Sequence, residues 1–442
     1  MDDVRSIPNR DPRPVMQGRL GRHLRTAFIG TYPPRQCGIA TFTHDLAAAV
    51  AMPTIDGGWA ESTPGSTKRI VVSADVVAID YEARAFPSEV RRRLDPDRPA
   101  DYLSVADGLN RSHYDVVSLQ HEFGIYGGRD GERVLDLLDE LAVPVVATLH
   151  TVLRHPSEHQ LRVLREVTRA AAKVVVLSHG AADTLASVYG VDLATIRVIP
   201  HGVPDLPFVD PETAKALLGL AGRPTILSFG LLGPSKGFEL AIRAMSGVVR
   251  RAANATYIIL GATHPELRRH EGEAYRDSLA ALVTELGLEQ HVRFVDAYVD
   301  LPTLGRWLQA ADVFVTPYPG AEQAVSGTLA FALGIGKAIV STPYDYAQEV
   351  LAEGRGRLVP FGDSAALGDQ IGDLLADSSG RDEARQRAYA YGRRMTWASV
   401  GGQYRELFAR VAADSLPTAD DTRAAALDLR LASRDREASS LG

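Results

Sequence analysis

The stretch ILSFGLLGPSKGFE, residues 226–239, contains the unit that decides the fold. Its apolar start is typical of a strand, and the loop after it carries glycine, proline and one lysine before a helical pattern begins. A second such unit, FIGTYPPRQCGIATFT at residues 28–43, lies near the start of the chain. A glycine-containing turn from strand to helix is the ordinary first connection of a doubly wound domain. Two such turns therefore predict two doubly wound domains.

Short β-branched and apolar runs alternate with helical patterns on both sides of a loop-like stretch at residues 202–223. Before it, the runs are 26–30, 69–75, 116–120, 143–149, 173–178 and 195–200. After it, they are 225–230, 256–260, 292–295, 313–317 and 338–342. This alternation predicts βαβ units, and therefore an α/β fold with a parallel sheet covered on both faces in each half.

The chain divides into two expected domains with polar ends. We place the first domain at 25–205 and the second at 206–380, and we interpret 1–24 and 413–442 as flexible tails because both are charged and poor in large apolar residues. Residues 381–412 form a last helical pattern. That helix either crosses back to the first domain or simply ends the second.

Composition excludes several classes of function. The 442 residues include 48 basic and 55 acidic ones, a net charge of −7, so nothing general favours nucleic acid as a partner, and an anionic ligand must be held locally. The single cysteine, Cys37, excludes an internal disulfide framework and a cysteine-rich metal site. No apolar run is long enough for a transmembrane segment, so we expect a cytoplasmic protein. Peripheral membrane contact and the oligomeric state stay open.

Three segments resemble a known family. They are IPHGVP at 199–204, the 226–239 unit, and PYPGAEQAVSGTLAFALGIGKAIVSTP at 317–343. In order and spacing they resemble glycosyltransferase family four, the glycosyl transferases group 1, over about residues 25–412. The resemblance implies the GT-B fold, in which two Rossmann-like domains face each other across a cleft. It also implies transfer of a hexose from a nucleotide diphosphate sugar with retention, the nucleotide binding mainly to the C-terminal domain.

The donor site is expected in the second domain. Lys236 can lie beside the diphosphate as a compact cation, and Gly230 before it lets the backbone approach the ligand. Ser326, Gly327 and Thr328 lead into a helix whose free amide groups would face the same phosphate. The leaving charge would then be stabilised without a metal or other cofactor.

Two positions depart from the family pattern, and one matches it. Glu322 matches the first acid of the paired-glutamate motif, which resembles a contact to the donor sugar and implies a catalytic role. Eight positions later stands Ala330, where the second acid is usually assigned to the ribose. Leu231 stands where many members carry an arginine ahead of the lysine. The diphosphate site is therefore expected to have lost one of its two usual cations.

Candidates in the first domain follow strand ends. His150 resembles the family's cleft histidine, and neutral imidazole there can bind a sugar or phosphate. His121 and Glu122 are candidates for the acceptor side, and His201 is a weaker one. Gly38 lets the backbone approach the ligand beside a helix start. The loop before it lacks both the G-x-G-x-x-G and the G-x-x-x-x-G-K-[ST] spacing, which disfavours dinucleotide and P-loop sites.

The block at residues 261–276 is expected to lie over the nucleotide or the mouth of the cleft. His264 and Arg276 are its polar groups to inspect, although helix capping and ion pairing are equally consistent with their positions. No motif carries metal-ligand spacing, so no metal is required.

The main hypothesis is a hexosyltransferase that uses UDP-glucose or GDP-mannose and a carbohydrate or glycoside acceptor. A nucleotide-sugar epimerase would convert the donor without acceptor, and a non-catalytic sugar-binding relative would bind the donor without turnover.

Overall fold

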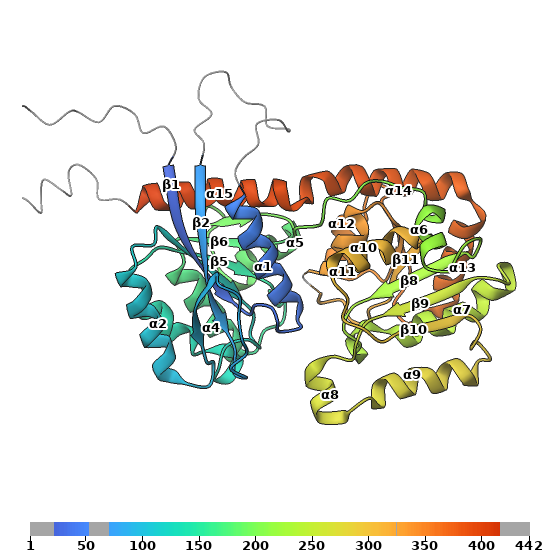
Figure 1. The fold of residues 1–442 in the computed structure, drawn as a ribbon, viewed down its shortest axis with the longest axis horizontal. Coiled ribbons are helices and arrows are strands. Elements are labelled where there is room, and N and C mark those ends of the chain that lie inside the picture. Colours follow the sequence, from blue (N-terminus) through green and yellow to red (C-terminus); the bar gives the residue numbers. More distant parts are fainter. Residues whose placement is uncertain (1–21, 53–69, 324, 416–442) are drawn as a thin grey trace, which may run out of the picture.

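The computed structural model describes residues 22–52, 70–323 and 325–415. It contains two parallel sheets, each with helices on both faces, placed side by side (Figure 1). The predicted α/β fold with two parallel sheets is therefore confirmed. The predicted tails lie outside the described residues, except that 22–24 begin the first strand, 413–414 end the last helix and Ser415 follows it.

The first sheet has seven strands in the order β3-β2-β1-β4-β5-β6-β7. The strands are β1 (Arg22–Gly30), β2 (Ile70–Ile79), β3 (Val90–Leu94), β4 (Val116–His121), β5 (Val145–Leu149), β6 (Lys173–Val176) and β7 (Ile196–Val198). The order reverses between β1 and β4, which opens a crevice at their carboxyl ends. The edge strand β3 was not predicted, because three consecutive arginines, 91–93, replace the apolar run that marks the buried strands.

Helices cover both faces of this sheet. They are α1 (Gly38–Ala51), α2 (Pro99–Arg111), α3 (Val134–Glu140), α4 (Glu158–Ala170) and α5 (His179–Tyr189). Local sequence fixes their starts. In α4, for example, Ser157 and Gln160 form a reciprocal capping box, and in α1 the Cys37 sulfur accepts from the Ala40 amide.

The second sheet has six strands in the order β10-β9-β8-β11-β12-β13. The strands are β8 (Thr225–Phe229), β9 (Thr256–Leu260), β10 (Val292–Val295), β11 (Val313–Thr316), β12 (Ala338–Ser341) and β13 (Arg357–Leu358). Its helices are α6 (Pro211–Leu217), α7 (Phe238–Arg251), α8 (Pro265–Glu271), α9 (Ala274–Glu285), α10 (Leu301–Ala310), α11 (Gly327–Gly334), α12 (Asp345–Val350) and α13 (Ser364–Ala376). The order reverses between β8 and β11, so this crevice lies beside the loops that follow those strands.

The last helices run along both domains (Figure 1). Helix α14 (Ser378–Gly392) packs on the second domain, and α15 (Trp397–Asp414) packs on α1 of the first. Tyr404 bonds Thr148 at 3.0 Å, and the Arg405 guanidinium donates to the Ala49 carbonyl at 2.6 Å. The last segment of the chain therefore completes the core of the first domain.

The chain passes between the domains twice, at two neighbouring segments. Val203 lies on the outward segment and Thr396 on the returning one, and they form a parallel bridge. The Val203 amide donates to the Met395 carbonyl at 2.8 Å, and the Trp397 amide donates to the Val203 carbonyl at 3.0 Å. A Cβ atom on Gly202 would lie 2.2 Å from the Trp397 ring, so only glycine permits this close approach.

Candidate functional site

Two adjoining cavities lie in the cleft between the domains. The first, which we call the Lys236 cavity, has a volume of about 940 Å³. The second, which we call the His150 cavity, has about 810 Å³. Gly38, Gly327 and His264 are among the residues that line both, so the cavities meet where α1 and α11 begin.

The loop after β8 carries Lys236 into the first cavity. A short 3-10 turn ends at Lys236, and Gly237 follows with a φ of 62°. A Cβ atom at this position would lie 2.2 Å from the Pro317 carbonyl oxygen. Glycine therefore lets the loop turn left-handed and pack against the end of β11, which fixes the base of the lysine side chain.

Lys236 belongs to a network of hydroxyl groups. Its ammonium lies 3.3 Å from the Tyr318 hydroxyl and 4.4 Å from the centre of that ring. The same hydroxyl lies 2.8 Å from Thr328 Oγ1 and 3.2 Å from Ser326 Oγ. Burial alone would raise the pKa of Tyr318, but the Lys236 charge and these hydroxyl groups lower it overall. The network holds the cation beside the start of α11.

Helix α11 presents its amino end to both cavities. Gly327 and Thr328 line the Lys236 cavity, whereas Ser326 is buried and caps the helix by accepting from the Leu329 amide at 3.3 Å. Ser326 is thus placed as a helix cap and not as a cavity-lining group. The N-terminal amide groups of a helix favour an anion, so phosphate fits this position.

The register of helix α11 places Ala330, where the family's acid for the ribose is expected, away from both cavities. Ala330 is fully buried in the core of the second domain and lines neither cavity. Phe331, one position later, lines the Lys236 cavity. The residue of α11 that faces the cavity here is therefore aromatic, and the absence of an acid at 330 leaves no gap in the cavity wall.

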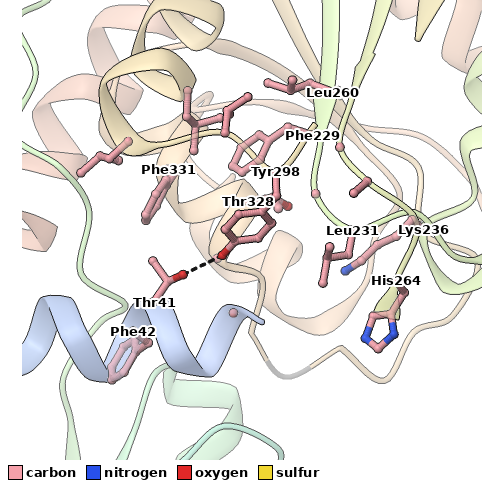
Figure 2. A pocket seen from close by; sticks show the side chains of 18 of the residues that line it. Thr41, Phe42, Phe229, Leu231, Lys236, Leu260, His264, Tyr298, Thr328 and Phe331 are labelled. Carbon is pink, nitrogen blue, oxygen red and sulfur yellow. Dashed lines mark hydrogen bonds between the residues drawn. The ribbon is translucent and has the colours of Figure 1, made fainter. Parts of the chain in front are cut away.

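The first domain supplies the opposite wall through α1. Thr41 and Phe42 face the Lys236 cavity, and Thr41 Oγ1 lies 3.0 Å from the Tyr298 hydroxyl of the second domain (Figure 2). Figure 2 also shows Lys236 and His264 on the far wall from this helix. The domains are thus in direct contact across the cavity.

The His150 cavity contains the acceptor-side candidates. The side-chain amide oxygen Oε1 of Gln120 accepts from His150 Nε2 at 3.0 Å, which leaves Nδ1 as the acceptor nitrogen. Burial first, and then His201 and His121, lower the pKa of His150 to about 3, so this imidazole is neutral near pH 7. Glu122 also lines the cavity, and its carboxylate accepts from the Gly124 amide at 2.6 Å.

The two remaining candidate histidines occupy different positions. His121 is fully buried beside Phe123 and lines neither cavity, so it is placed in the core and not at the acceptor. His201 lines both cavities, and its Nδ1 donates to the Gly202 carbonyl at 2.7 Å. Burial lowers the pKa of each to about 4. His201, which the motif ranked low, thus has the more direct access to a ligand.

Glu322 lies outside both cavities. Its side chain is 40% exposed, and its carboxylate lies 3.6 Å from His155 of the first domain. In this arrangement it contacts the other domain at the edge of the cleft, away from Lys236. The family motif correctly placed the loop of Glu322 beside the cleft, but the Glu322 side chain lines neither cavity.

The block at 261–276 has one residue that lines the cavities and one that lies behind their wall. His264 caps α8 and lines both cavities. Arg276 lines neither; it donates to the Gly261 carbonyl at 2.8 Å and pairs with Asp296 at 2.8 Å. Arg276 therefore supports the loop after β9 instead of contacting a ligand.

Across residues 22–52, 70–323 and 325–415, no group of three or more His, Cys, Asp or Glu side chains is arranged to hold a metal ion. Within the same ranges, no helix is long and apolar enough to cross a membrane.

Comparison with known proteins agrees with this architecture. Residues 38–205 match the family described as Glycosyltransferase Family 4, and residues 223–377 match Glycosyl transferases group 1. The chain belongs to this glycosyltransferase family. The two matches fall on the two Rossmann-like domains, and the predicted GT-B fold is confirmed. The protein is a glycosyltransferase, and hexosyl transfer from a nucleotide sugar is the activity that this membership supports.

Similar proteins include curated enzymes and solved structures. A D-inositol 3-phosphate glycosyltransferase of Kineococcus radiotolerans is 28% identical over 412 residues, which cover 85% of this chain and 91% of the relative. A GDP-mannose-dependent α-(1-6)-phosphatidylinositol monomannoside mannosyltransferase of Mycolicibacterium smegmatis is 29% identical over 260 residues, 56% of this chain and 63% of the relative.

Among solved structures, the sucrose-phosphate synthase of Thermosynechococcus elongatus aligns with a TM-score of 0.70 at 18% identity, covering 88% of this chain and all of the other. HepE of Anabaena in complex with UDP and glucose aligns with a TM-score of 0.64 at 20% identity, with the same coverage. At these identities the likeness concerns the fold.

Proposed function

We propose that this glycosyltransferase transfers glucose or mannose from UDP-glucose or GDP-mannose to a carbohydrate-containing acceptor, with retention at the anomeric carbon and without a metal. One observation supports the donor position most strongly. Lys236, Gly327 and Thr328 line the same cavity, so a fixed cation and the amino end of a helix converge on one place. Such an arrangement stabilises a departing diphosphate without reorganisation of the protein.

In this mechanism the donor occupies the Lys236 cavity, and the acceptor enters through the His150 cavity. The bond between the anomeric carbon and the phosphate oxygen breaks as the acceptor oxygen attacks from the same face. The departing phosphate takes the acceptor proton. Neutral His150, held by Gln120, orients groups near the reacting carbon through its Nδ1 acceptor. Contacts such as Thr41 with Tyr298 keep the domains closed around the reaction and exclude water.

The proposal is tested on the purified full chain. A thermal-shift screen with UDP, GDP, ADP and their sugars identifies the donor, because a ligand that prefers the folded state raises the melting temperature. NMR of the product made with that donor then gives the anomeric configuration. We expect retention, and turnover unchanged by EDTA. An inverted product would contradict the mechanism, and activity lost in EDTA but restored by a divalent ion would contradict its metal-free part.

A further inference from the structure

One guanidinium group in the cleft lacks a polar partner. Arg35, on the loop between β1 and α1, lines the His150 cavity, and its side chain forms no hydrogen bond or ion pair with any residue the structure describes. Its Nη1 atom is buried. A buried donor on a cation is costly when it has nothing to bond, so an unpaired one facing a cavity points to a ligand oxygen.

The other arginines of this cavity are already paired. Arg84 pairs with the fully buried Asp80, and Arg269 pairs with Glu82 at 3.0 Å. Their charges are therefore neutralised by the protein itself. Arg35 is the arginine of this wall whose charge remains available to a ligand.

An aromatic side chain holds Arg35 in place. Two guanidinium groups contact the ring of Tyr81, with Arg35 5.1 Å and Arg269 5.5 Å from its centre. The Tyr81 hydroxyl donates to Glu266 of the second domain at 2.9 Å. Tyr81 thus fixes the direction of Arg35 while connecting its loop to the second domain.

The neighbouring Lys236 cavity has too little positive charge to balance a nucleoside diphosphate by itself. Among the described residues that line it, Lys236 is the one lysine, arginine is absent, and Asp45 and Asp300 are carboxylates. A nucleoside diphosphate carries several negative charges, and one cation beside two carboxylates does not balance them. Leu231, at the position expected to hold a cation, gives this wall an apolar surface.

The two cations approach the same place from different domains. His264 lines both cavities, as does Gly327 at the amino end of α11. Burial lowers the pKa of His264, Glu266 opposes that shift, and the charges of both Lys236 and Arg35 lower it further. Lys236 lines the first cavity with His264 and Arg35 lines the second with His264, so both cations border the junction of the cavities, where we place the diphosphate.

We propose that Arg35 binds the diphosphate of the donor from the first domain, opposite Lys236, and supplies the second cation that the second domain lacks. This rests on the proposed function, because it assumes that a nucleoside diphosphate sugar is the donor. With Arg35 in the first domain and Lys236 in the second, donor affinity depends on the closed arrangement of the two domains.

The test is calorimetric titration of the full chain with UDP, GDP and ADP and with the matching monophosphates. We expect Arg35→Gln to weaken the nucleoside diphosphate that the wild type binds roughly 10- to 100-fold, and the monophosphate much less, because a charged hydrogen bond to phosphate is lost. Arg35→Lys should recover part of the affinity. Arg111→Gln is the matched control, because Arg111 pairs with Asp107 at 2.7 Å within the first domain and outside both cavities.

The outcomes separate the two proposals. If Lys236→Ala weakens the diphosphate but a folded Arg35→Gln variant binds it like wild type, the assignment of Arg35 is wrong and the proposed donor site stands. If Arg35→Gln changes only the KM of the acceptor, Arg35 binds the acceptor instead, and the assignment is again overturned. If the wild type binds none of the three diphosphates, both proposals fail. Melting temperatures of all variants show that each is folded.

Discussion

The two cavities of the cleft differ in the number of charged side chains that line them and in how these side chains are paired. The Lys236 cavity places one lysine among hydroxyl groups, two carboxylates and apolar walls, whereas the His150 cavity is lined by three arginines and three glutamates. In the second cavity, most of these charges are paired with one another. A site with few charges suits charge that develops during the reaction, and the paired part of the His150 cavity suits neutral sugar hydroxyl groups. Substitutions in each cavity can test this difference.

The largest effect is expected at the single cation. Lys236→Ala should lower kcat by roughly 100- to 1000-fold, by analogy with the loss of one oxyanion donor, because the departing diphosphate loses its closest charge. The measurement is turnover at saturating donor, with melting temperature as the check on folding. Lys173→Ala, whose ammonium bonds the Ala194 carbonyl in the first domain, is the control. Unchanged turnover would show that Lys236 is not at the diphosphate.

A smaller and different effect is expected in the balanced cavity. Glu122→Gln should raise the KM of the acceptor about tenfold and leave the KM of the donor unchanged, because a charged acceptor of hydrogen bonds becomes neutral. Steady-state kinetics with each substrate varied in turn measure this. Glu140→Gln, at the exposed end of α3, is the control. An equal change in both KM values would remove the distinction between the cavities.

The core behind the His150 cavity gives a prediction about pH. Burial lowers the pKa of His121 to about 4 from its usual 6.5, so below pH 6.5 the unfolded chain binds a proton that the folded chain does not. Stability therefore falls as the pH decreases toward 4, by up to about 1.4 kcal/mol per pH unit for this group. His121→Phe should reduce the loss of melting temperature between pH 7 and pH 5.

The same substitution has a second expected result. Both ring nitrogens of His121 are buried without a partner among the described residues, so Phe at this position should be neutral or stabilising at pH 7. His270→Gln, at an exposed position, is the control for the pH effect. A variant with the same pH dependence as wild type would show that His121 is not the group responsible.

The smallest effect is expected at Glu322. Because its side chain lies at the edge of the cleft beside His155, Glu322→Gln should change kcat less than about threefold, as for an exposed ion pair. Binding of the free nucleotide should not change. A loss of 100-fold or more in kcat would mean that the backbone around Glu322 rearranges when the donor binds, and that Glu322 then reaches the reacting centre.

Contiguous motifs made part of this site predictable. Lys236, Gly327 and Thr328 follow strands in short segments whose order is visible in the sequence, so their placement at one cavity follows from the topology of a doubly wound sheet. His150 and Glu122 follow the ends of neighbouring strands β5 and β4 in the same way.

Other residues could not be placed from the sequence, because their positions depend on the rotation of a helix or on contacts between distant segments. Whether Ala330 or Phe331 faces the ligand depends on a rotation of about 100° per residue along α11, which motif spacing does not define. Arg35 is distinctive only because it lacks partners, and partners come from segments distant in the chain. Tyr318 sits inside the motif, but its contact with Lys236 joins residues 82 positions apart.

Helix α15 has a consequence for how the chain is made. Its Val400, Tyr404 and Phe408 belong to the same apolar cluster as Phe28 and Leu46 of the first domain, yet they are synthesised after the whole second domain. A nascent first domain on the ribosome therefore has an uncovered apolar face until the final residues emerge. Because exposed apolar surface promotes aggregation, we expect this interval to require protection by a chaperone, whereas the second domain can complete its two core clusters earlier.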